Sequence, residues 1–276
     1  MQSKMSVFRK NKAFTVFLLL AICIGLVAVF APVIATHDPA EAVLTDALKA
    51  PSAQHLFGTD KLGRDLFSRV IFGTRISVSA SLILVACIFV LGSVLGILAG
   101  YFGGKVDMVI MRVADMMIAF PGMVLAIAVA GILGPSITNA VIAITLVSWT
   151  KYARLARSLV LKMKNCDYIA AAKVTGSKTL HILARYMFPD VTPTLVITAA
   201  TDIGSMMLEL AGLSFLGFGA RPPMAEWGLM LSEGRQYMQN APWLMLFPGL
   251  AILIVVVVFN LLGDSLRDVL DPRDER

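Results

Sequence analysis

Two acidic residues lie in an apolar segment of the chain that is long enough to cross a membrane. Asp202 and Glu209 fall within residues 193–216, seven positions apart, which is about two helical turns and places them on one face. Thr198 and Ser205 lie on or near that face. Ionisable groups inside a membrane are costly and usually face protein or a water-filled path. These residues are therefore candidates for lining a polar pathway, or alternatively for a polar seam to a partner protein or a pair with a nearby arginine.

The sequence lacks the residue patterns of common catalytic sites. It has no G-x-x-x-x-G-K-[ST] stretch that would cradle a nucleotide phosphate, and no evident Ser/His/Asp or Cys/His set. Its cysteines are far apart, and so are its histidines, His37, His55 and His181, so their spacing indicates neither a disulfide framework nor a metal site. We therefore expect a protein that is not an enzyme, with no catalytic residue, no cofactor and no bound metal, which takes its energy from a partner.

The composition is that of a helical membrane protein. Of the 276 residues, 58% are hydrophobic and 15% are charged, with a mean hydropathy of +0.80, whereas a soluble domain carries about 25% charged residues. A helix needs about 20 apolar residues to cross the bilayer. We predict an all-α membrane protein with six transmembrane helices, at residues 14–35, 77–100, 112–134, 139–158, 193–216 and 242–262. The first run is longer than the apolar part of a signal peptide, so we expect it to be retained.

Lysine and arginine indicate which side of the membrane each connection faces. With both termini inside, 17 of the 24 basic residues fall on the cytoplasmic side. The outer segment 36–76 is the exception, because it holds five of the others, balanced by five acids. The basic residues flank apolar spans and form no separate basic domain, which argues against nucleic-acid binding. We predict cytoplasmic N- and C-termini and a chain surrounded by membrane lipid.

The longest and most basic inner connection, residues 159–190, has a helical pattern broken by a glycine. Its notable positions are Ala170, Ala171, Ala172, Gly176 and Pro189. The alanines favour a helix, the glycine marks where that helix ends or bends, and Ser177 is placed to cap a second helix that the proline stops. This predicts two short helices along the membrane face. They either anchor the loop at the interface or fit a groove on another protein.

Other patterns predict local structure. Asp65 precedes an interfacial helix that leads into the second span, and caps and turns explain the glycines and aspartates near it. Arg112 and Asp115 are three apart and predict a local ion pair, while Pro121 predicts a kink in the third span. Glycines repeat every four residues in the second span and permit close helix packing, at Gly92, Gly96 and Gly100.

The inner connection resembles the cytoplasmic loop of ABC importer permeases, which has the form E-A-A-x3-G-x9-I-x-L-P. Its alanine, glycine and proline positions match, at Ala171, Ala172, Gly176 and Pro189. Ala170, Tyr186 and Phe188 stand where the family has glutamate, isoleucine and leucine. Other segments resemble the C-type inner-membrane permease of the dipeptide, oligopeptide and nickel transport family, over about residues 14–272: HLFGTDKLGRD (55–65), GGKVD (103–107), RVAD (112–115), AFP (119–121), LSFLG (213–217), EWG (226–228) and NLLGDSLRD (260–268).

The resemblance implies a type I ABC importer permease fold and a set of partners. These are a second, B-type permease that forms a heterodimer with this chain, two ABC ATPase subunits that hydrolyse ATP, and an extracytoplasmic substrate-binding protein. The inner loop would be the helix that couples the ATPases to the spans. Nickel, nickel chelates or small peptides would cross the cytoplasmic (inner) membrane, with a lean towards nickel. The implied organisation is a single transmembrane permease domain over residues 1–276, with a first span at 14–35, an outer loop at 36–76, a core at about 77–262 and a coupling loop at 159–190.

Within the same family, a permease specific for dipeptides or oligopeptides is the nearest alternative. Two alternatives belong to other classes. An ion- or proton-coupled secondary transporter would use Asp202 and Glu209 as relay groups, and a stand-alone channel would need neither a relay nor a partner. Secondary transporters often contain internal repeats, and none is convincing in this sequence. Transport that persists without an ATPase partner would favour these two classes.

Overall fold

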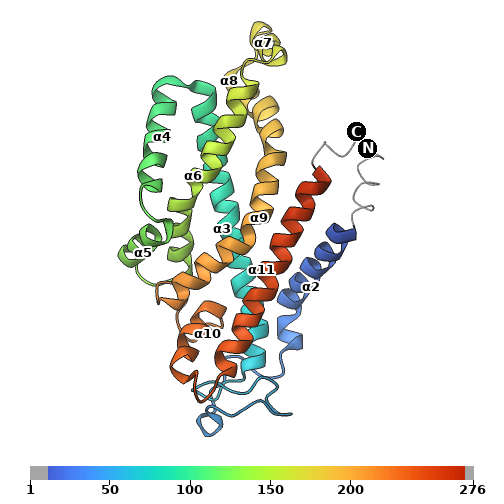
Figure 1. Ribbon diagram of the computed structural model, residues 1–276, viewed down its shortest axis with the longest axis vertical. Coiled ribbons are helices and arrows are strands. Elements are labelled where there is room, and N and C mark those ends of the chain that lie inside the picture. The colour runs from blue at the N-terminus through green and yellow to red at the C-terminus, as the bar shows by residue number, and fades with distance from the viewer. Residues whose placement is uncertain (1–11, 271–276) are drawn as a thin grey trace.

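The computed structural model describes residues 12–270 as a bundle of helices (Figure 1). In this part of the chain the elements are helices, with no strand among them. Long helices build the bundle: α2 (Lys12–Ile34), α3 (Leu66–Phe102), α6 (Ile137–Met163), α9 (Phe188–Phe215) and α11 (Trp243–Leu270). Shorter ones join them: α4 (Gly104–Ile118), α5 (Gly122–Leu133), α7 (Asp167–Val174), α8 (Thr179–Ile182), α10 (Trp227–Gly234) and the 3₁₀ turns Leu44–Asp46 and Arg235–Tyr237. The predicted all-α class is confirmed.

The predicted spans fall on helices, but the third is broken, and α6, which holds the predicted span 139–158, is not among the helices apolar enough to cross a membrane. Helices α2, α3 and α11, and the continuous helix Thr179–Phe215, are long and apolar enough to cross a membrane. Helices α4 and α5 pass this test only as a pair, and they meet at a bend of 96°. The predicted span at 112–134 is therefore wrong as a single helix, because α4 already begins at Gly104 and ends before Pro121, which cannot continue the helical hydrogen bonding.

Large apolar side chains cover the outside of the bundle. Only 6% of the most apolar part of α2 is buried, and its Val33 is 81% exposed. Ile132 of α5 is 87% exposed. Soluble monomers rarely expose apolar surface on this scale. The exterior is therefore suited to contact with lipid chains.

The core of the bundle is a close contact between α3 and α6. Gly92, Gly96 and Gly100 of α3 lie against backbone and side-chain atoms of α6, and a Cβ added at Gly100 would lie 2.8 Å from the Cβ of Val160. At Gly96 it would lie 2.7 Å from the Cβ of Ala156. These separations are shorter than ordinary carbon contacts, so glycine is required there. The predicted packing role of the glycine repeat is confirmed.

The two ends of the bundle carry different structures (Figure 1). Helices α7 and α8 lie at one end, towards which α2 begins and α11 ends. The irregular segment 35–65 and α10 lie at the opposite end. We call the first the α7 end and the second the α10 end.

The predicted stop at Pro189 is wrong. The chain runs from α8 through a π-helical turn, Leu183–Met187, directly into α9, where Pro189 occupies the first turn. Pro189 lies inside the continuous helix Thr179–Phe215, where it lacks the N–H for one internal hydrogen bond, and it follows the π-helical turn that interrupts the regular α-helical bonding. The π-helical turn just before it widens the backbone, a distortion that occurs frequently at functional sites.

Candidate functional site

The turn between α7 and α8 is built around Gly176. After α7, the N–H of Ser177 donates to the carbonyl of Ala172 at 3.0 Å, and the N–H of Gly176 donates to that of Lys173 at 3.0 Å. This is a Schellman ending, which requires a left-handed residue, and Gly176 has φ +80°. The predicted helix–glycine turn–helix is confirmed. The predicted cap at Ser177 is wrong, because α8 has Lys178 at its N-cap and no side-chain cap.

One face of α7 is anchored to the bundle. Ile169 is fully buried and Ala172 is 6% exposed. The hydroxyl of Tyr168 donates to Asp190 of α9 at 2.9 Å, and the ammonium of Lys173 lies 5.7 Å from the centre of the Tyr101 ring at the end of α3. Partial burial and the Asp190 carboxylate raise the pKa of Tyr168 to about 12. The tyrosine therefore stays protonated as a donor at neutral pH.

The opposite face of this loop is apolar and exposed. Val174 is 88% exposed and Leu180 is 77% exposed, and they stand on either side of Gly176. Ala170 and Ala171 are exposed as well. No heavy atom lies within 4 Å of the position a Cβ would take at Gly176. The tip of the α7 end therefore offers a small apolar surface that the described part of the chain leaves uncovered.

Asp202 of α9 is held by two residues of α6. The ammonium of Lys151 lies 2.7 and 2.9 Å from its carboxylate oxygens, and the hydroxyl of Tyr152 donates to it at 3.0 Å. Asp202 is buried, whereas the Lys151 side chain is 59% exposed. The structure thus pairs Asp202 with a cation of a neighbouring helix, which is a lysine where the sequence suggested an arginine.

The other polar residues of α9 do not join this pair. The Thr198 hydroxyl donates to the carbonyl of Thr194 on its own helix at 3.0 Å. Ser205 is exposed and Glu209 is half-buried. These residues are thus spread along one helix with different degrees of exposure, and only Asp202 is tied to α6.

Ion pairs fasten α4 to α6. Arg157 binds the two carboxylate oxygens of Asp107 at 2.5 and 2.6 Å, and Arg154 binds Asp115 at 2.6 Å. The predicted pair of Arg112 with Asp115 is therefore wrong. The partner comes from another helix, which helical spacing alone does not reveal.

A network of buried charges organises the α10 end. The guanidinium of Arg64 binds Asp60 at 2.6 Å and Glu233 at 3.2 Å. Arg69 lies 3.6 Å from Asp60 and 3.5 Å from Glu233, and it donates to the carbonyls of Pro39, Pro223 and Met224. The two arginines are 2% and 1% exposed. The network ties segment 35–65 and α3 to α10, so the stretch HLFGTDKLGRD has a structural role here.

Helix α10 is capped by a buried acid. The carboxylate of Glu226 accepts from the N–H groups of Gly228 at 3.0 Å and Leu229 at 2.8 Å. The Trp227 indole donates to the carbonyl of Val70 in α3 at 3.0 Å. The motif EWG thereby fixes α10 against α3.

Comparison with known sequences identifies the family. The family model described as binding-protein-dependent transport system inner membrane component matches residues 92–275. The N-terminal transmembrane domain of oligopeptide transport permease C matches residues 1–51. The chain belongs to the binding-protein-dependent inner-membrane permeases. It is a non-catalytic, multi-pass component of the inner membrane, and the predicted resemblance is confirmed.

Relatives of this permease are named for the transport of different substrates. The dipeptide transport permease of Alkalihalophilus pseudofirmus is 44% identical over 265 residues, covering 96% of this chain and 87% of the relative. The nickel transport permease of Escherichia coli K12 is 44% identical, covering 86% and 85%. The glutathione transport permease of Pectobacterium atrosepticum is 46% identical, covering 82% and 75%. Membership in this family does not favour the ion-coupled transporter or the channel.

The permease fold is also seen in a solved structure. A chain of the inward-facing MetNI methionine ABC transporter matches with a TM-score of 0.59 and 17% identity, covering 75% of this chain and 98% of that one. The likeness shows a shared fold. It agrees with the importer fold expected from the sequence.

Sequence reasoning missed the features of this permease that depend on distant contacts. Helix α10 and its Glu226 cap were not predicted, because glutamate is not among the residues that commonly cap the start of a helix. The equal number of acids and bases in residues 36–76 hinted at the buried network. His37 and His55, which are remote in sequence, have ring centres 5.0 Å apart.

Proposed function

We propose that the chain is one of two different permease subunits in an ABC importer. A B-type permease forms the heterodimer with it, two ATPase subunits lie beneath the pair on the side of its α7 end, and a substrate-binding protein delivers substrate at its α10 end. ATP hydrolysis belongs to the ATPase subunits. Residues 1–276 act as a single permease domain, with the coupling loop at 159–190.

The observation that carries this proposal is the uncovered apolar tip of the α7 end. Val174 and Leu180 are exposed at the far tip of the bundle, and exposed apolar patches on a folded surface mark sites of contact with a protein or a membrane. The other face of α7 is anchored by Ile169 and Tyr168. A rigid element pressed into a partner's groove can move packed helices as a body, and α8 is continuous with α9.

The membrane arrangement we propose has six spans with both termini in the cytoplasm. Helices α4 and α5 together make the third span, and α6 makes the fourth despite its basic end. The α7 end is then cytoplasmic. This is supported by the basic residues of 151–190 and by the common direction of the α2 start and the α11 end (Figure 1).

The substrate path follows α9, with Asp202, Glu209, Ser205 and Thr198 as its candidate polar residues. The different exposures of these residues suit a path along the helix better than a closed binding site. Nickel, a nickel chelate or a small peptide fits this proposal, because relatives at 44% identity are named for dipeptide and for nickel transport.

Uptake of labelled nickel and of a labelled dipeptide, measured side by side, tests the proposal. Cells that lack the chain are compared with cells in which it is restored, each with and without the ATPase partner. We expect one substrate to be lost and recovered with the chain, and only when the ATPase is present. Uptake that persists without the ATPase contradicts the proposal, as does unchanged uptake of both substrates.

A further inference from the structure

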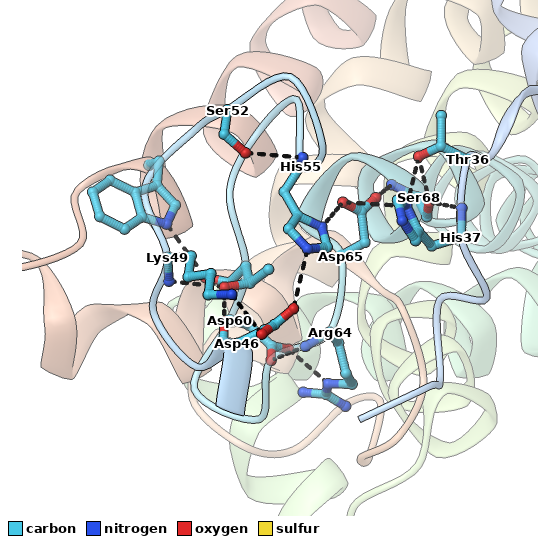
Figure 2. A network of polar contacts seen from close by, with 12 residues as sticks. Thr36, His37, Asp46, Lys49, Ser52, His55, Asp60, Arg64, Asp65 and Ser68 are labelled. Atoms are coloured by element: carbon cyan, nitrogen blue, oxygen red, sulfur yellow. Dashed lines mark hydrogen bonds and ion pairs between the residues drawn. The ribbon is translucent and has the colours of Figure 1, made fainter. Parts of the chain in front are cut away.

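Three potential metal ligands meet where segment 35–65 joins α3. His37 follows α2, His55 lies in the middle of the segment, and Asp65 is the N-cap of α3. Their ligand atoms all lie within 4.8 Å of one another. The Nδ1 atoms of His37 and His55 are 3.8 and 3.0 Å from the same oxygen, Oδ1 of Asp65. Figure 2 shows both rings turned towards this carboxylate.

The arrangement is held in place by bonds that a ligand would not disturb. The other oxygen of Asp65, Oδ2, accepts from the N–H of Ser68 at 2.8 Å, which leaves Oδ1 facing the histidines. The N–H of His37 donates to the Ser68 hydroxyl at 3.0 Å. Asp65 is 3% exposed and His55 is 6% exposed. The site is therefore built into the fold.

Hydrogen bonds within the chain leave His55 unsatisfied. Its Nε2 is buried without a hydrogen-bond partner in the described part of the chain, and Oδ2 of Asp46 lies 3.6 Å away. If Nδ1 carries the proton of the neutral ring and donates it to Asp65, the lone pair on Nε2 faces the Asp46 carboxylate. A metal bound at Nδ1 moves the proton to Nε2, where Asp46 accepts it. Metal-bound histidines commonly donate their other N–H to a carboxylate in this way.

We propose that Nδ1 of His37, Nδ1 of His55 and Oδ1 of Asp65 bind one divalent transition-metal ion of the zinc or nickel class. Imidazole nitrogen favours such ions over magnesium or calcium. Bonds of about 2.0–2.1 Å in a tetrahedral site place ligand atoms about 3.3 Å apart. The distances of 3.0 and 3.8 Å to Asp65 need only small shifts, and the ligand atoms of the two histidines, which lie within 4.8 Å of each other, move closer together. The Thr36 hydroxyl lies 3.0 Å from Nδ1 of His37 and would lose this contact to a metal ion. It keeps Ser68 Oγ, 3.5 Å away, as another hydrogen-bond partner.

The ion joins the end of α2 to the start of α3. His37 is half-exposed, so solvent reaches the site and a water completes the coordination. Only 6% of the most apolar part of α2 is buried. A metal ion between the end of α2 and the start of α3 therefore adds a contact that apolar packing does not supply.

Metal titration of the purified full-length chain, with any purification tag removed, tests this site. We expect one equivalent of Zn²⁺ or Ni²⁺ to bind in calorimetry, and X-ray absorption to report two imidazole ligands. His37→Ala and His55→Ala should weaken binding more than about 100-fold, and Asp46→Asn about 10- to 100-fold. His181→Ala, which alters an exposed histidine in the coupling loop, is the matched control and should bind as the unaltered chain does.

Folding is checked by thermal unfolding without metal, which His37→Ala should leave unchanged because that side chain is half-exposed. Absence of binding to the unaltered chain overturns the inference, and so does binding that His37→Ala leaves intact. The measurement needs neither uptake nor ATP hydrolysis. The metal site and the proposed importer function can therefore be tested independently of each other.

Discussion

The two ends of the bundle differ in whether their notable side chains have partners within the chain. At the α10 end, Arg64 and Arg69 are almost fully buried and bind Asp60 and Glu233 within the chain. At the α7 end, two large apolar residues stand free in the described structure. A buried ion network is costly to break, whereas an exposed apolar tip gains free energy when another protein covers it. The α10 end is held together by charges buried within the chain, whereas the α7 end leaves an apolar tip that the proposed ATPase contact would cover.

The largest expected effect comes from breaking the network at the α10 end. Arg69→Met should lower the free energy of unfolding by about 3–5 kcal/mol, because Asp60 and Glu233 lose one of their two buried cations. Arg75→Met, six residues later on α3 and exposed, should change it by less than about 0.5 kcal/mol. Thermal and denaturant unfolding in detergent micelles measure both. Equal stabilities would show that the network is not needed.

A smaller effect is expected from the pair between α6 and α9. Lys151→Met should lower the free energy of unfolding by about 2 kcal/mol, since it leaves the buried Asp202 carboxylate without its cation. The loss is smaller than at Arg69 because Lys151 is 59% exposed and water replaces part of the interaction. Adding Asp202→Asn should restore most of the stability. If this stable double variant still imports poorly, Asp202 acts in transport; normal import would remove it from the proposed path.

Local rules predicted much of the fold, and contacts between distant segments explain what they missed. The turn at Gly176 and the packing glycines of α3 follow from short-range geometry. The partner of Asp115 is on α6, and the charges of 36–76 are buried by α10, whose position depends on the whole bundle. Pro189 was misjudged because the π-helical turn before it has no simple sequence pattern. For the candidate site, the sequence predicted two helices joined at a glycine turn, whereas the exposure of Val174 and Leu180 could be learned only from the structure.

A still smaller effect is expected from the turn in the proposed coupling loop, where a change of backbone shape can be tested without changing the apolar tip. Gly176→Val should strain the turn by about 1 kcal/mol, because a β-branched residue disfavours the left-handed conformation at φ +80°. Gly176→Asn should be tolerated, since asparagine adopts that conformation more readily. Open space surrounds the glycine within the described chain, and valine and asparagine are similar in size, so a difference between the two variants reflects backbone strain. ATP hydrolysed per substrate imported is the measure, and identical ratios would show that this turn does not transmit coupling.

Binding of the ATPase subunits to the apolar tip tests the central claim most directly. Leu180→Asp is compared with Leu44→Asp, which places the same change on a 72% exposed leucine at the α10 end. We predict that Leu180→Asp weakens ATPase binding about tenfold or more and uncouples ATP hydrolysis from import, with unfolding unchanged. Leu44→Asp should leave ATPase binding as it was. Normal ATPase binding by a folded Leu180→Asp permease would contradict the account.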